Sequence, residues 1–135
     1  MTTTSKPTPL ASPQSQAYWD AAAQGRLVLQ CCAACGQIRH YPRLLCNTCY
    51  SDTVVWKDAS RRGKVHSWTV AHHAFHAAFV ADVPYTLVTV DLDEGVRALG
   101  RWRCDTSPAM GQPVQCSFDF NNAHGGDLVF KPLTA

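Results

Sequence analysis

The sequence lacks long hydrophobic runs: no stretch approaches the ~18 consecutive apolar residues that a membrane-spanning helix needs. Residues 1–13 are rich in threonine, serine and proline, and they lack the basic start and apolar stretch of a secretory signal peptide. We therefore expect a cytoplasmic protein. Residues 1–12 are expected to form a flexible tail.

Charge is also sparse. Charged residues make up 16% of the 135 residues, and the formal net charge is only +2. Nucleic-acid-binding domains usually carry a strong basic patch, so this balance does not favour that class. Apolar residues make up 46%, which is typical of a globular chain forming one domain or two very small ones.

No familiar catalytic motif is present: there is no G-x-S-x-G, no phosphate-binding Walker loop and no dinucleotide fingerprint. Cys104 follows a predicted strand, and the sequence places no base beside it to activate the thiol. We therefore expect that the chain is not an enzyme by itself. The alternative is a self-sufficient hydrolase or lyase that uses Cys104 and a histidine cluster.

That cluster comprises His72, His73 and His76. On a helix, His72 and His76 would share a face and could bind metal, but no helix is predicted there. We interpret the three as loop histidines at the rim of a barrel. Phe75 and Phe79 lie in the same loop, and with His76 they could line a ligand or partner surface.

The strongest signal comes from four of the seven cysteines. Cys32 and Cys35 form one C-x-x-C pair, Cys46 and Cys49 form another, and ten residues lie between the pairs. Two such turns facing each other provide the tetrahedral thiolate set that zinc prefers, and four protein ligands leave no open position for catalysis. We predict one structural zinc ion per chain. The alternatives are unrelated reduced thiols or a redox dithiol. Cys31 has the wrong spacing to Cys35 and is interpreted as a strand residue.

A short helix is predicted over residues 13–25. Ser12 is a suitable N-cap, Pro13 fits the first helical position, and Gly25 can take the left-handed conformation that ends a helix. A helix this short is marginal alone and must dock on the rest of the protein. Tyr18 and Trp19 are the expected anchors.

The remaining pattern is typical of β-structure. Leu27–Gln30 reads as a strand leading into the cysteines. Short β-runs split by turn residues then follow, at Lys64–His73, Pro84–Leu92, Val96–Arg103, Pro113–Phe120 and Leu128–Lys131, with a hairpin turn at 93–95. In Pro113–Phe120, the residues Val114, Cys116, Phe118 and Phe120 alternate with polar residues, which predicts one buried face. Asn121–Asp127 is expected to form a loop before the last strand. Five such strands suggest a small barrel such as an OB-fold. The predicted fold is mainly β: an N-terminal helix, a zinc ribbon over residues 26–60 and a barrel over residues 61–135.

Three arginines follow one face of the third β-run: Arg97, Arg101 and Arg103. They form either a solvated outer face or a phosphate-binding stripe, because arginine pairs well with phosphate. Both CoA and nucleic acid could use such a stripe.

The order of these motifs resembles a known family, the zinc-ribbon/OB-fold proteins associated with acyl-CoA enzymes, long catalogued as a domain of unknown function. The resemblance covers roughly residues 14–133. It is carried by the Tyr18-Trp19 helix, the two cysteine pairs with Gly36 and Pro42-Arg43, Trp56, Gly63, Pro84-Tyr85, Asp91 to Gly95, Gly111 and Val114.

The resemblance implies a rubredoxin-like ribbon followed by an OB-fold. It also implies a non-catalytic accessory subunit of a thiolase-like enzyme that acts on acyl-CoA thioesters by acyl transfer, thiolysis or retro-aldol cleavage. The partner would hold the catalytic residues, and the small subunit would shape the CoA and acyl channel and stabilise the complex. The alternatives are a partner for a MaoC-like enoyl-CoA hydratase and a single-stranded nucleic-acid-binding module. Eight residues are candidates for contact with CoA or the partner: Tyr18, Trp19, Phe75, His76, Phe79, Arg97, Arg101 and Arg103.

Overall fold

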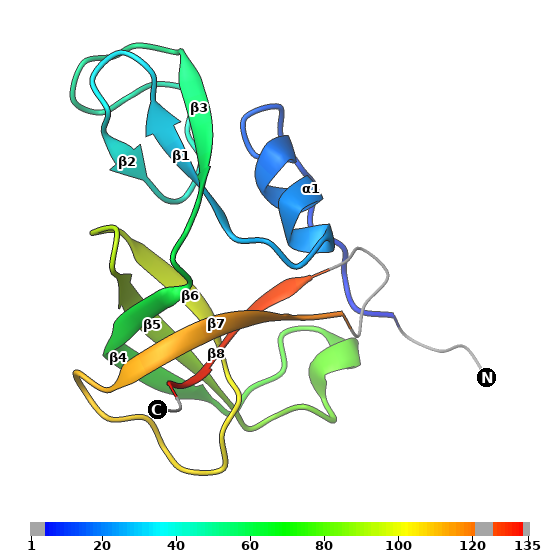
Figure 1. Cartoon of the computed structure of the whole chain (residues 1–135). Helices are drawn as coiled ribbons and strands as arrows, with labels where there is room; N and C mark the ends of the chain where they lie inside the picture. The colour runs from blue at the N-terminus through cyan, green and yellow to red at the C-terminus, as the bar shows by residue number, and fades with distance from the viewer. Residues whose placement is uncertain (1–4, 121–125, 134–135) are drawn as a thin grey trace.

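The computed structural model describes residues 5–120 and 126–133. A single α-helix, α1 (Gln16–Ala23), precedes a small sheet and then a barrel (Figure 1). The sheet has the order β2-β1-β3 and consists of β1 (Val28–Cys32), β2 (Ile38–Arg39) and β3 (Val54–Asp58). The closed barrel has the order β4-β5-β6-β8-β7 and consists of β4 (Arg62–Ala71), β5 (Tyr85–Leu92), β6 (Arg97–Trp102), β7 (Pro113–Asp119) and β8 (Asp127–Pro132), with the short 3-10 helix η1 (Ala77–Phe79) before β5. The predicted mainly β class with a five-stranded barrel is confirmed.

Helix α1 begins later than the sequence predicts. The Ser15 N–H donates to the Ser12 carbonyl at 3.0 Å and to the Ser12 hydroxyl at 3.2 Å. Residues 12–15 therefore form a turn, and the prediction of Ser12 as N-cap with Pro13 at the first helical position is wrong. The local reason is that serine side chains offer backbone groups an alternative to the helical pattern.

The end of α1 follows the prediction. Gly25 has a φ of 74°, which glycine adopts at little cost. The Gly25 N–H donates to the Ala22 carbonyl at 3.0 Å and the Arg26 N–H to the Ala21 carbonyl at 2.9 Å. This paired closure satisfies carbonyls that a helix end leaves free.

Strand β1 is the centre of the small sheet, and all five of its residues are buried. The sequence predicts a strand at Leu27–Gln30 but misses β2 and β3, which flank it. Gln30 is buried, and its Oε1 accepts from Arg39 Nε at 2.6 Å and from the Arg43 N–H at 2.8 Å. These bonds compensate for burying a polar side chain and fix the loop after β2 against β1.

The barrel strands match the predicted runs to within a few residues. The hairpin at 93–95 is present, with the Leu92 N–H bonded to the Val96 carbonyl at 2.8 Å and Gly95 at a φ of 89°. In β7, Val114 and Cys116 are buried as the alternation predicts. Phe120 is 52% exposed, so its place on the buried face is wrong, because the strand ends at Asp119.

One hydrophobic core joins the three parts of the chain. Tyr18 of α1, with Leu27 and Leu29 from the ribbon side, belongs to the same buried cluster as Val88 and Phe130 of the barrel. Burial of each large side chain stabilises the fold by roughly 1.5–3 kcal/mol. Helix and small sheet lie side by side against one end of the barrel (Figure 1).

Within the described ranges, no helix has the length and apolar character needed to cross a membrane. The cytoplasmic location and the flexibility of residues 1–12 stay predictions. Residues 1–4 and 121–125, the latter part of a loop predicted before the last strand, lie outside the described residues.

We predict that Gly63→Ala destabilises the protein by about 1–3 kcal/mol through overpacking. A Cβ at this position would lie 2.4 Å from the Asp91 carbonyl oxygen and 2.7 Å from Val90 Cγ1. Urea unfolding measures the effect, with the exposed Ser67→Ala on the same strand as control. Equal midpoints for both variants and the wild type would contradict the close approach of β4 and β5.

Candidate metal centre and neighbouring groove

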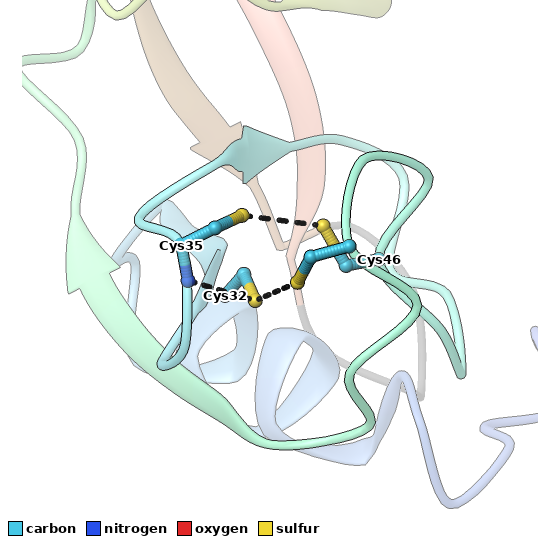
Figure 2. Close-up of side chains that lie close together, drawn as sticks. Cys32, Cys35 and Cys46 are labelled. Carbon is cyan, nitrogen blue, oxygen red and sulfur yellow. Dashed lines mark hydrogen bonds between the residues drawn. The ribbon is translucent and has the colours of Figure 1, made fainter.

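The two cysteine pairs meet at one end of the small sheet. Figure 2 shows the side chains of Cys32, Cys35 and Cys46 pointing toward one another. The Cys32 and Cys49 sulfurs are 3.5 Å apart, the Cys35 and Cys46 sulfurs are 3.6 Å apart, and all four lie within 4.8 Å of one another. Zinc–sulfur bonds of about 2.3 Å in a tetrahedron require sulfur separations of about 3.8 Å. The donor set and its spacing therefore fit one tetrahedral zinc ion.

Backbone N–H groups are directed at two of the sulfurs. The Cys35 N–H approaches Cys32 Sγ at 3.5 Å, and the Thr48 N–H approaches Cys46 Sγ at 3.4 Å. Hydrogen bonds from the Cys49 and Thr48 backbone lower the pKa of Cys46 to about 6, and those from Cys35 and Ala34 lower the pKa of Cys32. Stabilised thiolates are the form that binds a metal.

The pKa of Cys35 shifts in the opposite direction. The Gln37 N–H lowers its pKa, but burial and the neighbouring sulfurs outweigh that effect and raise it to about 12. Four thiolates this close repel one another, so full ionisation needs a cation among them. Zinc bound here would supply a rigid cross-link between two turns, and its four protein ligands would leave no position for a substrate.

Cys31 is not part of this set. It is buried in β1, and its sulfur lies 3.5 Å from the Gly36 carbonyl oxygen. Successive strand residues point to opposite faces, which separates Cys31 from its neighbour Cys32. The interpretation of Cys31 as a strand residue is confirmed.

We predict that Cys46→Ser removes zinc and lowers the melting temperature, because the ribbon depends on the metal for its folding free energy. Zinc per chain, measured by elemental analysis, should fall from about one to near zero. Cys31→Ser and Cys104→Ser are the controls and should keep the metal. Retention of zinc by Cys46→Ser, or its loss in both controls, would refute the assigned ligands.

A groove of about 740 Å³ lies between α1, the loop after β2, η1 and the outer face of β5, β6 and β8. This volume is in the range of small-molecule sites. Its aromatic lining consists of Tyr18, Trp19, Tyr41, Phe79 and Tyr85. The Leu99 N–H of β6 donates to the Tyr41 hydroxyl at 3.2 Å, which ties the ribbon loop to the barrel across the groove.

The predicted contact residues separate into two groups. Tyr18, Trp19, Phe79, Arg101 and Arg103 line the groove. The other three, Phe75, His76 and Arg97, do not line it. Their role in contacting CoA or a partner stays a prediction.

Among the described residues that line the groove, each cation is paired with a carboxylate. Lys6 Nζ lies 2.7 Å from Asp82 Oδ2, and Arg101 Nη1 lies 3.5 Å from the same oxygen. Arg103 pairs with Asp119. The hydrogen bond from Lys6 is the main cause that lowers the pKa of Asp82. The arginine stripe is therefore neutralised by the chain's own acids, which sequence reasoning did not foresee.

The histidine loop shows no metal site. His76 Nδ1 accepts from the Ala78 N–H at 3.0 Å at the start of η1, and the His73 ring packs edge-on to Phe75 with centroids 4.6 Å apart. Throughout residues 5–120 and 126–133, the four-cysteine group is the one metal-ligating cluster found. Cys104 is exposed at the rim of a second, polar pocket.

His40 is a residue that sequence reasoning missed. Its ring lies between Tyr18 and Tyr41, with centroid distances of 5.5 Å and 4.0 Å. Burial lowers the pKa of His40 to about 4. The imidazole is therefore neutral at physiological pH and acts as a packing element beneath the groove wall.

The lowered pKa of His40 predicts that the free energy of unfolding depends on pH. The unfolded chain binds a proton at His40 more readily than the folded chain does, because burial lowers the pKa of His40 only in the folded state. The stabilisation that the neutral imidazole gives is therefore complete above about pH 6.5 and is lost as the pH falls toward 4. Between pH 7 and 5.5 the loss should be about 1 kcal/mol. Urea unfolding of the zinc-loaded protein at both pH values tests this. His40→Phe keeps a ring and should remove that part of the pH dependence, whereas an unchanged slope would contradict a buried neutral His40.

The protein-family model described as the rubredoxin-like zinc ribbon domain of ChsH2 matches residues 19–55 of the chain. The family model described as the C-terminal OB-fold domain of ChsH2 matches residues 56–119. These matches confirm the predicted ribbon and OB-fold and agree with the zinc site formed by the four cysteines.

Several solved structures resemble the chain, and two of them are compared with it below. One, described as an Ltp2-ChsH2(DUF35) aldolase, is 33% identical with a TM-score of 0.84, covering 93% of this chain and 98% of that chain. A DUF35 protein of unknown function from Sulfolobus solfataricus is 14% identical with a TM-score of 0.61, covering 90% of this chain and 86% of that one, and supports the fold alone.

A curated relative from Thermomonospora curvata carries the name "Probable enoyl-CoA hydratase alpha subunit". It is 42% identical over 95 residues, which are 68% of this chain but 28% of the relative. The chain therefore spans less than a third of that protein's length.

Proposed function

The chain belongs to the ChsH2 family of zinc-ribbon and OB-fold proteins, and from this premise we propose that it is an accessory subunit of an enzyme acting on acyl-CoA thioesters. The catalytic residues lie on a thiolase-like partner, and the reaction is acyl transfer, thiolysis or retro-aldol cleavage. The observation that carries the proposal is the likeness to the Ltp2-ChsH2(DUF35) aldolase over nearly the whole length of both chains.

The side chains of this protein support an accessory role. Cys104 is exposed, while His76 accepts a hydrogen bond from the Ala78 N–H and the His73 ring packs against Phe75. A nucleophile needs an adjacent base, and no such pairing is seen in the described residues. The chain contributes surface and groove, while the partner supplies the chemistry.

A second candidate function is partnership with a MaoC-like enoyl-CoA hydratase. The relative named as a probable hydratase alpha subunit favours it. Both candidates share acyl-CoA thioesters as the substrate class. The seven cysteines form no disulfide in the structure, which suits a reducing compartment, and we place this work in the cytoplasm.

The nucleic-acid-binding alternative receives less support. OB-folds that bind single strands combine stacking aromatics with a positively charged groove. Here Arg101 lies over the Tyr85 ring at 4.4 Å, but its charge is shared with Asp82. The carboxylates would repel a phosphate backbone.

The test is affinity capture of the tagged protein from its native cell, followed by mass spectrometry. We expect a stoichiometric thiolase-like partner. A MaoC-like hydratase in its place would select the second candidate. Recovery of nucleic acid, or of the chain alone, would overturn the proposal.

Phe75 is the residue we assign to the partner surface. Its side chain is 91% exposed, and a protruding aromatic ring is a typical interface anchor. We predict that Phe75→Asp weakens partner binding about tenfold or more. Met110→Asp is the matched control, since Met110 is 77% exposed on a different loop. Calorimetric titration of the partner into each variant measures the effect, and equal affinities would remove Phe75 from the interface.

A further inference from the structure

Arg39 in β2 is buried without a carboxylate partner. Among the described residues it is the one buried charged side chain, with 6% of its surface exposed. Its Nε donates to Gln30 Oε1 at 2.6 Å and its Nη2 donates to the Arg43 carbonyl oxygen at 3.3 Å, so both acceptors are uncharged. Its Nη1 is buried and has no hydrogen-bond partner within residues 5–120 and 126–133. The ion pairs of the same residues do not include Arg39.

A buried guanidinium of this kind requires an explanation. Arginine is not deprotonated in proteins, and burying its charge is costly unless an opposite charge lies nearby. Even the exposed Arg97 and Arg103 of this chain lie against aspartates. The charge that offsets Arg39 must therefore come from a group other than a carboxylate of the described residues.

The strand register places Arg39 beside the cysteine cluster. Arg39 lies directly opposite Gln30 in the pairing of β2 with β1. Gln30 and Cys32 are two residues apart on β1, so their side chains share one face of the sheet. Arg39 is on that face too, and diagonal neighbours across an antiparallel pair are about 7–8 Å apart, which is the relation of Arg39 to Cys32. The Arg43 carbonyl that Arg39 contacts belongs to the loop leading to Cys46. The guanidinium thus lies between the two segments that carry the metal ligands.

The metal centre supplies negative charge at this place. Four thiolates around one divalent zinc ion leave the loaded site with a net double negative charge. Cys32 and Cys46, one ligand from each pair, are buried, so solvent screens that charge incompletely. A cation some 7–8 Å away is attracted to such a site more strongly than it would be in water.

Hydrogen bonding alone does not account for a charged residue at this position. Gln30 already ties the loop to β1 without Arg39, because its Nε2 donates to the Arg43 carbonyl at 3.0 Å and its Oε1 accepts from the Arg43 N–H at 2.8 Å. A neutral side chain at position 39 would leave both bonds in place. The feature that only a cation adds is its charge.

We propose that Arg39 is the counter-charge of the zinc–thiolate centre. Its buried guanidinium offsets part of the negative charge of the four-cysteine site, and the loaded site in turn offsets the cost of burying Arg39. Arg39 is a positioning residue for the metal centre, since it acts through the field at the ligands and does not bind the ion. The inference concerns the ribbon and does not depend on the proposed acyl-CoA function.

Iron in place of zinc reports this charge directly. Zinc has no redox chemistry, whereas iron bound by the same four thiolates is singly negative as Fe³⁺ and doubly negative as Fe²⁺. A nearby cation favours the more negative, reduced form. Arg39→Met should therefore move the reduction potential of the iron-loaded full chain to a more negative value. We expect the ratio of oxidised to reduced iron at a fixed potential to rise about tenfold, which corresponds to about 59 mV for one electron. Redox titration followed through the visible absorption of the iron–thiolate centre measures the shift and verifies that the metal is bound.

Two further variants separate charge from packing. Arg43→Met is the matched control, because the Arg43 side chain is exposed and its bonds to Gln30 and Arg39 use the backbone. Solvent screens its charge, so the ratio should change less than about twofold. Arg39→Lys keeps the charge but loses the planar fork, and it should restore a potential near that of the wild type. A merely structural role would leave the lysine and methionine variants equally perturbed.

The outcome decides the assignment in each case. If Arg39→Met does not bind iron, Arg39→Gln, which can still hydrogen-bond to the loop, takes its place and should show the same negative shift. An unchanged potential in the neutral variants, an equal shift in Arg43→Met, or no recovery in Arg39→Lys would overturn the proposal.

Discussion

Coordination of one cation by four cysteine thiolates is the constraint on which the ribbon and one wall of the groove depend. Most residues between Cys32 and Cys49 are exposed, so this segment gains little from hydrophobic burial. The metal links its two turns instead, and Gln30 anchors the intervening loop through Arg39 and the Arg43 backbone. The loop then presents Tyr41 to the barrel, where its hydroxyl accepts from the Leu99 N–H. Loss of the metal would therefore alter the position of Tyr41 in the wall of the groove.

The groove exists because helix, ribbon and barrel share one core without covering the outer face of β5 and β6. Tyr18 belongs to that core and also lines the groove, so it connects stability with the candidate site. Burial raises the pKa of Tyr18 well above its usual value, and the phenol stays protonated. His40 packs against the same ring as a neutral imidazole. The aromatic wall is thus held by uncharged groups.

Charge pairing bears on the two interpretations of the three arginines, a solvated outer face or a phosphate-binding stripe. Arg97 and Arg101 lie on one face of β6, as the alternation of the strand predicts, and Arg103 directly follows the end of the strand. Each of them has a carboxylate partner from another part of the chain. Ion pairs at such partly exposed positions contribute little to stability, with a median near 0–1 kcal/mol. Their electrostatic effect is local, because each carboxylate offsets the positive charge of the arginine beside it.

Features set by neighbouring residues were predictable from the sequence. The two C-x-x-C spacings define the metal ligands, Gly25 ends the helix, and the alternation around Val114 and Cys116 marks a buried face. Each depends on a few consecutive residues, whose geometry follows from backbone preferences and side-chain chemistry. The barrel was predictable for the same reason, since its runs and turns alternate along the chain.

Tertiary structure decided what depends on distant partners. Strand β2 is only two residues long and exists through pairing with β1, so no local pattern indicates it. The groove joins Lys6, Tyr41, Asp82 and Leu99, which are far apart in the sequence. The net charge of such a site depends on which acids fold against which bases. The sequence by itself therefore determined the metal centre and the positions of the barrel strands along the chain, whereas long-range packing and ion pairing decided the order of strands in the sheets and the shape of the groove.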